Sequence, residues 1–503
     1  MNSPSPRSST SSDSFASGRA SPINGFDSSA ALIIVPDSED SDTPNGGVSF
    51  DFSSEDDDTE DESDLQLERI RDSPIPPLSS ISVFLYLLAP FTKLGALLVP
   101  SADLPLNVAL PAFVLFAVLA AFTRQLWYML ARYVRRADLE EIVLETFARG
   151  RGKETRRAFL RQLVRFFTGL LRVLVAALYL RFSVDLLLPY SPDVLAISAR
   201  AITTLILAAF IAPLVAARTL GSRAVIYASW ASIAAYAVWF SCTAYMHAKH
   251  ILVPVAESSS LGTLWHGIPA FSFTFATMST VPLYASLKGT VSPLHPKPRR
   301  SQSFKLLSAL SIAIGVAGNL PLVFFEASPK PPQLPSTSLK TTVAVLGAAS
   351  LLLSVPSLVI TTPQLPLPLS IRRATNFPLS KVLVYILIII LSVLPMSITR
   401  VGSDLVLLLA FASTYMVPAL LHIITHNFRR PLSIVIPPTT PTMSSQLSPS
   451  DSANDELLQR KERTLQRRRL GRRLVWDIGV WILLVPVGGG GLVWAVGRMA
   501  GKC

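Results

Sequence analysis

The most regular feature of the chain is a series of long apolar segments separated by polar connections. Each segment has about 18–25 residues, the length that an α-helix needs to cross the hydrocarbon core of a bilayer. This pattern predicts an all-α polytopic membrane protein with about 11 transmembrane helices. The predicted spans are 81–100, 107–131, 163–188, 198–217, 224–247, 266–287, 304–325, 341–361, 380–399, 404–426 and 474–497.

Positive charge alternates between the connections. Lys and Arg are concentrated in every second connection and are sparse in the others. Because connections rich in Lys and Arg stay on the cytoplasmic side of a membrane, we predict a cytoplasmic N-terminus. An odd number of spans then places the C-terminus in a lumen or outside the cell. The rich connections are 132–162, 218–223, 288–305, 372–381 and 429–473.

Two regions differ in composition from the membrane domain, which we expect to cover residues 80–498. Residues 1–79 are rich in Ser, Pro, Asp and Glu, and contain too few apolar residues to offset the entropy of ordering. We predict a disordered acidic cytoplasmic tail whose serines are candidate kinase substrates, or alternatively a tail that only aids solubility. Residues 428–473 are predicted to form a basic cytoplasmic loop before the last helix.

Composition excludes several functions. Half of the residues are hydrophobic and 16% are charged, which suits a chain solvated by lipid. The net charge of +12 lies beside the spans and not in a separate basic domain, so no nucleic-acid partner is expected. The two cysteines and six histidines show no convincing ligand spacing, and we predict no metal and no cofactor. We find no hydrolase motif or paired intramembrane aspartates, and therefore expect no enzyme.

Two predicted spans contain residues that disrupt a helix. The first contains Pro90, Lys93 and Gly95, and the sixth alternates Ser and Thr with Phe between Pro269 and Pro282. An interrupted helix frees backbone amide and carbonyl groups that can bind a small zwitterion. A simple proline kink in the first span, and helix packing through small residues in the sixth, are the alternatives.

Two interrupted spans that lie five apart fit an inverted repeat of five plus five helices, with discontinuous helices 1 and 6 and one extra C-terminal helix. Residues 95–100 resemble the G-x-G-x-L-x-x-P motif in the first span of the amino acid/auxin permease family, and 271–284 resemble its F-x-F…LPxY segment. Residues 354–372 and 404–422 are similar to the eighth and tenth spans of the family and the connection after the eighth.

This resemblance, which suggests a fungal-type vacuolar member of the family, implies a secondary active transporter that moves amino acids by alternating access, coupled to protons. A non-transporting amino acid sensor or scaffold in the membrane is the alternative. The vacuolar membrane is favoured, and the plasma membrane is the other candidate. The resemblance implies that the substrate is held by Gly95, Ala96, Leu97, Phe271, Ser272, Phe273, Thr274 and Thr277.

Two charged residues inside predicted spans are candidates for ion or proton coupling. Lys93 stands where the family motif has its first glycine, and its ammonium group would take the place of a coupling cation. Alternatively, and more commonly for lysine, it snorkels to an interface. Asp185 lies four residues after Arg181, so the two side chains share a helix face, and a structural pair is the alternative to a role in coupling.

Overall fold

The structure is a computed structural model. It describes residues 75–102, 104–134, 138–148, 154–190, 199–249, 252–253, 261–277, 280–288, 304–325, 328–329, 337–365, 378–428 and 476–500. Residues 1–74 of the predicted acidic tail and residues 429–473 of the predicted basic loop lie outside this set.

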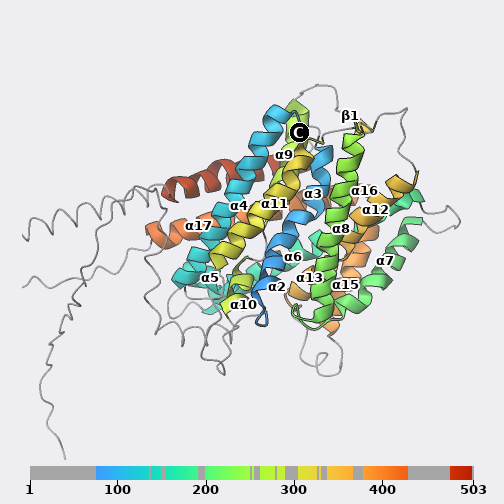
Figure 1. Cartoon of the computed structure of the whole chain (residues 1–503). Helices are drawn as coiled ribbons and strands as arrows, with labels where there is room; N and C mark the ends of the chain where they lie inside the picture. Colours follow the sequence, from blue (N-terminus) through green and yellow to red (C-terminus); the bar gives the residue numbers. More distant parts are fainter. Residues whose placement is uncertain are drawn as a thin grey trace, which may run out of the picture. The chain divides into compact units, whose positions relative to one another are not determined.

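The described residues are almost entirely helical (Figure 1). A pair of two-residue antiparallel strands, β1 (Leu252–Val253) and β2 (Ser328–Pro329), joins two connections. The helices are α2 (Ser80–Leu88), η1 (Ala89–Thr92), α3 (Leu94–Leu98), η2 (Val99–Ser101), α4 (Leu106–Val134), α5 (Leu139–Phe147), α6 (Glu154–Leu187), η3 (Leu188–Tyr190), α7 (Ala199–Val215), α8 (Arg223–Ala248), α9 (Leu261–Thr274), α10 (Thr280–Lys288), α11 (Phe304–Val323), α12 (Thr337–Leu352), α13 (Val355–Thr361), α15 (Leu379–Val393), α16 (Met396–Phe411), η4 (Ala412–Met416), α17 (Val417–Ile423), η5 (Ile424–Phe428), η6 (Leu483–Gly489) and α19 (Gly490–Met499).

Long apolar helices account for most of the predicted spans. In the described part of the chain, 8 helical segments are long and apolar enough to cross a membrane. Many large apolar side chains lie on the outside, as Phe210 does with 66% of its surface exposed. Such side chains suit contact with lipid, and the all-α polytopic architecture agrees with the prediction. The segments are Ser80–Ser101, Leu106–Ala131, Glu154–Tyr190, Arg223–Ala248, Phe304–Val323, Ser338–Thr361, Ile398–His426 and Trp476–Met499.

The predicted count of 11 spans differs from these 8. Two predicted spans are shorter apolar helices: α7 has 17 residues and α15 has 15. In the second case Pro395 is the reason, because the residue before a proline avoids the helical conformation. Leu394 is accordingly extended at φ −56° and ψ 150°, and residues 396–399 begin α16 instead of ending α15. The third, predicted at 266–287, is divided between α9 and α10.

The buried apolar side chains form two clusters. The first is built mainly from α2, α4, α9, α10 and α11, with the last segment of the chain. The second is built mainly from α6, α7, α12, α13 and α15. The two interrupted segments contribute to both clusters, since Phe91 and Phe275 belong to the first, and Leu94 and Ala276 to the second. The helix breaks therefore lie where the two clusters meet.

Candidate functional site

The first apolar segment is interrupted in its middle. The α-helix α2 gives way to the 3₁₀ turn η1, which has Pro90 in its first turn. Lys93 then adopts an extended conformation, with φ −112° and ψ −154°, before α3 begins at Leu94. Proline has no backbone donor and its ring clashes with the preceding turn, which explains a break at this position. The predicted discontinuity of this segment is present.

Side chains from two neighbouring helices bind the carbonyl groups near this break. Arg124 of α4 is fully buried, and its Nη2 donates to the Leu87 carbonyl at 2.6 Å. Asn319 of α11 donates from Nδ2 to the Phe91 carbonyl at 2.8 Å. An unpaired carbonyl at this depth would cost several kcal/mol, so these contacts stabilise the interrupted conformation.

The sixth apolar segment is interrupted as well, and it crosses the first. The helix α9 ends at Thr274, and α10 begins at Thr280 with Pro282 in its first turn, where a proline is tolerated. A Cβ atom at Gly95 would lie 2.5 Å from both Cα and N of Thr274. Only glycine permits backbones to approach this closely. Gly95 is therefore the point at which the two interrupted segments touch.

A cavity of about 100 Å³ lies beside this crossing. One water molecule needs about 10–15 Å³ measured in this way, so the cavity has room for a small organic molecule. The first segment contributes Lys93 and Gly95 to its wall, and the sixth contributes Phe273 and Ala276. The helix α6 and the α12–α13 region contribute further lining residues. Ile75, Leu220 and Leu283, from the first apolar cluster, line the cavity as well.

Lys93 is buried, with 4% of its surface exposed, and does not snorkel to an interface. Its Nζ donates to Ser232 Oγ of α8 and, at 3.3 Å, to the Ser350 carbonyl of α12. Ser232 Oγ donates to the same Ser350 carbonyl. A buried ammonium group requires such polar partners. Lys93 thus links the break in the first segment to two other helices.

The predicted substrate residues lie together around the crossing, but they do not all face the cavity. Gly95 and Phe273 line the cavity, and Ala96 is fully buried next to them. Leu97 is partly buried between the two apolar clusters. The other predicted residues are buried near the break in the sixth segment: Phe271, Ser272, Thr274 and Thr277.

These four residues make different contacts. Phe271 packs against Phe113, with ring centroids 6.0 Å apart. Ser272 and Thr274 donate their hydroxyl protons to carbonyl groups of the preceding turn. Thr277 Oγ1 is buried and has no hydrogen-bond partner among the described residues. Their roles in binding a substrate stay predictions.

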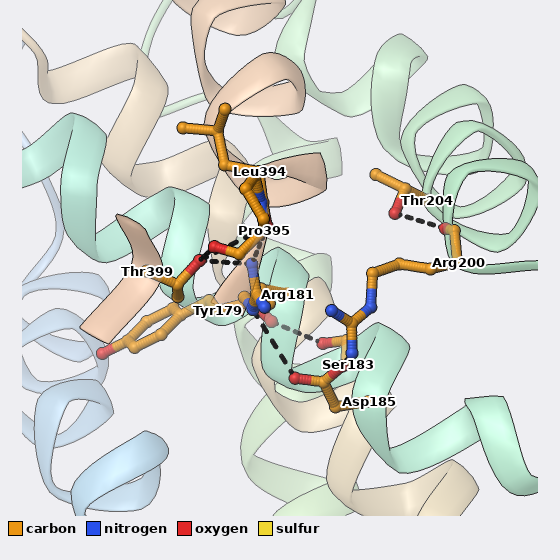
Figure 2. A network of polar contacts seen from close by, with 9 residues as sticks. All are labelled: Tyr179, Arg181, Ser183, Asp185, Arg200, Thr204, Leu394, Pro395 and Thr399. Carbon is orange, nitrogen blue, oxygen red and sulfur yellow. Dashed lines mark hydrogen bonds and ion pairs between the residues drawn. The ribbon is translucent and has the colours of Figure 1, made fainter. Parts of the chain in front are cut away.

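Asp185 does not line the cavity. It belongs to a network of polar contacts (Figure 2). Its carboxylate pairs with Arg181 Nε at 3.7 Å, as the i, i+4 spacing predicts, and with Arg200 Nη2 of α7 at 2.7 Å. Arg181 also donates to the Leu394 carbonyl and to Thr399 Oγ1, at the junction of α15 and α16. These contacts connect four helices and support the structural alternative for Asp185.

The helix α6 contributes cavity residues that were not among the predicted ones, which on this helix included only Asp185. Arg172, Val175 and Tyr179 of this helix line the cavity, at spacings of three and seven residues that place them on one face. A charged residue in the middle of an apolar helix was the available signal, because such residues usually face a cavity or a partner. Ser354, Ser357 and Thr361 of the α12–α13 region were missed as well.

Comparison with known proteins finds no protein-family model that matches the chain and no curated protein that matches it significantly. The resemblance to the amino acid/auxin permease family therefore stays a prediction.

Proposed function

We propose that the chain is a secondary active transporter of the amino acid/auxin permease type, which moves amino acids across a membrane by alternating access. The observation that carries this proposal is the crossing of two interrupted helices at Gly95 and Thr274, beside a cavity lined by both breaks. Freed backbone groups at interrupted helices are how many transporters bind the charged ends of a zwitterion.

The division of the core supports the same proposal. The first apolar cluster contains α2, α4 and the α9–α11 region, and the second contains α6, α7 and the α12–α15 region. Two bodies with separate cores can rock against each other about a site at their boundary, which is what alternating access requires. We propose that α7, α15 and the divided α9–α10 segment also cross the membrane, giving 11 spans in a five-plus-five inverted repeat and one further helix.

Orientation and location follow the sequence prediction. We place the N-terminus in the cytoplasm because Lys- and Arg-rich connections alternate with poor ones along the chain. The vacuolar membrane is favoured from the family resemblance alone. Ile75, Leu220 and Leu283 line the cavity and lie near predicted cytoplasmic connections. In this orientation the cavity would lie on the cytoplasmic side of the crossing, and we propose that this conformation is inward-facing.

Lys93 is our candidate for proton coupling. Its protonated ammonium group would hold the first segment to Ser232 and Ser350, and loss of the proton would weaken this link between α8, α12 and the break. In the Lys93→Met variant, the dependence of amino acid uptake on pH should flatten, because the titrating group is gone. An unchanged pH profile would remove Lys93 from the coupling mechanism.

Flux measurements test the function itself. The full-length chain in proteoliposomes should accumulate radiolabelled amino acids when a pH gradient is imposed, and a protonophore should abolish the accumulation. Lys93 also links three helices, which would suit a protein that no longer changes conformation to transport. The alternative function, a non-transporting sensor, therefore needs its own test. Saturable amino acid binding without flux would favour the sensor, and neither binding nor flux would refute both functions.

A further inference from the structure

The cavity beside the helix crossing has a distinct charge. Among the described residues that line it, Lys93 and Arg172 carry charge and none is Asp or Glu. The two positive groups come from different helices, since Lys93 is at the break in the first segment and Arg172 is on α6. A small cavity with this lining attracts anions and repels cations.

Arg172 has unused capacity to bind an anion. Its side chain is buried, and its Nη1 donates to the Thr361 carbonyl. A guanidinium group has five N–H donors, and this contact uses one nitrogen. A carbonyl oxygen carries no net charge, so the positive charge of Arg172 is not neutralised by its hydrogen bond.

Among the described residues, little negative charge lies close enough to compensate Arg172. Asp138, before α5, acts on Arg172 through its field, but no ion pair joins the two among the described residues. Burying a charge without a close counter-ion is costly, whereas a planar carboxylate can accept two parallel hydrogen bonds from a guanidinium group. A carboxylate in the cavity would therefore be bound strongly.

Lys93 is less available, because its ammonium group already donates to Ser232 and Ser350. Under the proposed function, backbone groups at the two breaks bind the α-amino and α-carboxyl groups that every amino acid carries. Arg172 then remains for a group that only some amino acids have. Tyr179 lies about two turns from Arg172 on the same face of α6 and adds a hydroxyl donor to the cavity wall.

We propose that the cavity selects dicarboxylic amino acids, and that Arg172 binds their side-chain carboxylate. This inference rests on the proposed function, because it assumes that the cavity holds an amino acid. The cavity would then distinguish a side-chain carboxylate from the neutral amide of nearly the same shape, as in glutamate and glutamine. Aspartate and asparagine form the second such pair.

Uptake into proteoliposomes that contain the full-length chain tests this proposal. We expect kcat/KM for glutamate or aspartate to exceed that of the amide analogue by about tenfold or more, since a buried donor set discriminates strongly against a poorer acceptor. The Arg172→Gln variant should lose this preference, measured as a fall in the ratio of glutamate to glutamine uptake. Arg172→Lys should retain part of the preference, because the charge remains without the bidentate geometry.

Arg165→Gln is the matched control. Arg165 lies on the same helix, is exposed, and pairs with Glu140 at 2.8 Å outside the cavity. Its substitution should leave the ratio of glutamate to glutamine uptake unchanged. A change of the same size in both variants would overturn the assignment to Arg172.

The outcomes separate this inference from the proposed function. Preferred uptake of glutamine or leucine, with no effect of Arg172→Gln on the preference, refutes acidic selectivity and leaves amino acid transport intact. Absence of uptake or binding of any amino acid refutes both. If Arg172→Gln does not fold, thermal stabilisation of the wild-type protein by glutamate compared with glutamine still decides, and equal stabilisation overturns the proposal.

Discussion

Replacing Gly95 with alanine perturbs the contact on which the proposed site depends. The new methyl group would lie 2.5 Å from the Cα and N of Thr274 and 2.7 Å from its Oγ1. Carbon atoms in ordinary contact are about 3.5–4.0 Å apart, so α3 and α9 must separate by roughly 1 Å. Two of these three atoms belong to the backbone of Thr274, and a side-chain rotation cannot relieve them.

Two opposing effects determine how much the substitution changes the free energy of unfolding. Inserting a methyl group into a packed interior typically costs about 1–3 kcal/mol. Replacing glycine by alanine within a helix returns roughly 0.5–1 kcal/mol. We expect a net loss of about 1–2 kcal/mol and, at roughly 2–4 °C per kcal/mol, a fall of Tm by a few degrees. Because a displacement of about 1 Å disturbs a binding geometry strongly, uptake should fall by about 10- to 100-fold.

Thermal unfolding in detergent and uptake into proteoliposomes check this prediction. Gly402→Ala is the matched control, since Gly402 lies in α16 and a Cβ atom there meets nothing within 4 Å. This variant should be as stable as the wild type or slightly more stable, with unchanged uptake. If Gly95→Ala behaves as Gly402→Ala does, the two interrupted segments do not cross at Gly95.

Two further predictions concern the break in the first segment and the connection before α6. Asn319→Leu leaves the Phe91 carbonyl without its donor and should cost about 1–3 kcal/mol, measured as a lower Tm, whereas Tyr236→Phe should cost less because Asn319 keeps its contacts with the backbone. Equal effects of the two variants would contradict this reasoning. Burial, followed by the charge of Glu140, raises the pKa of Asp138 above its usual value, so ionisation of this side chain opposes folding. Asp138→Asn still caps α5 and should be more stable than the wild type at pH 7, with the gain disappearing as the pH falls through the raised pKa; a gain independent of pH would refute this cause.

Sequence and structure agree where the determinants are local. Runs of apolar residues fix the helices because a backbone in lipid must satisfy its own hydrogen bonds. Pro90 lies in the 3₁₀ turn at the first interruption, and Pro282 lies in the first turn of the helix that follows the second. The pairing of Arg181 with Asp185 follows from helix geometry alone. The predicted helix ends were wrong where apolar residues continue through a helix break. The span predicted at 380–399, for example, is interrupted before Pro395.

Only the tertiary structure decided which groups meet across the core. Lys93 contacts Ser232 and Ser350, which are 139 and 257 residues away along the chain. The sequence by itself determined that the chain is a helical membrane protein, and it located the two interrupted segments. It could not show that Arg172 and Lys93 line the same cavity. Most transmembrane helices have similar apolar surfaces, so the sequence does not specify which helices pack against one another. The packing of segments that are distant in sequence brings these two residues to one cavity.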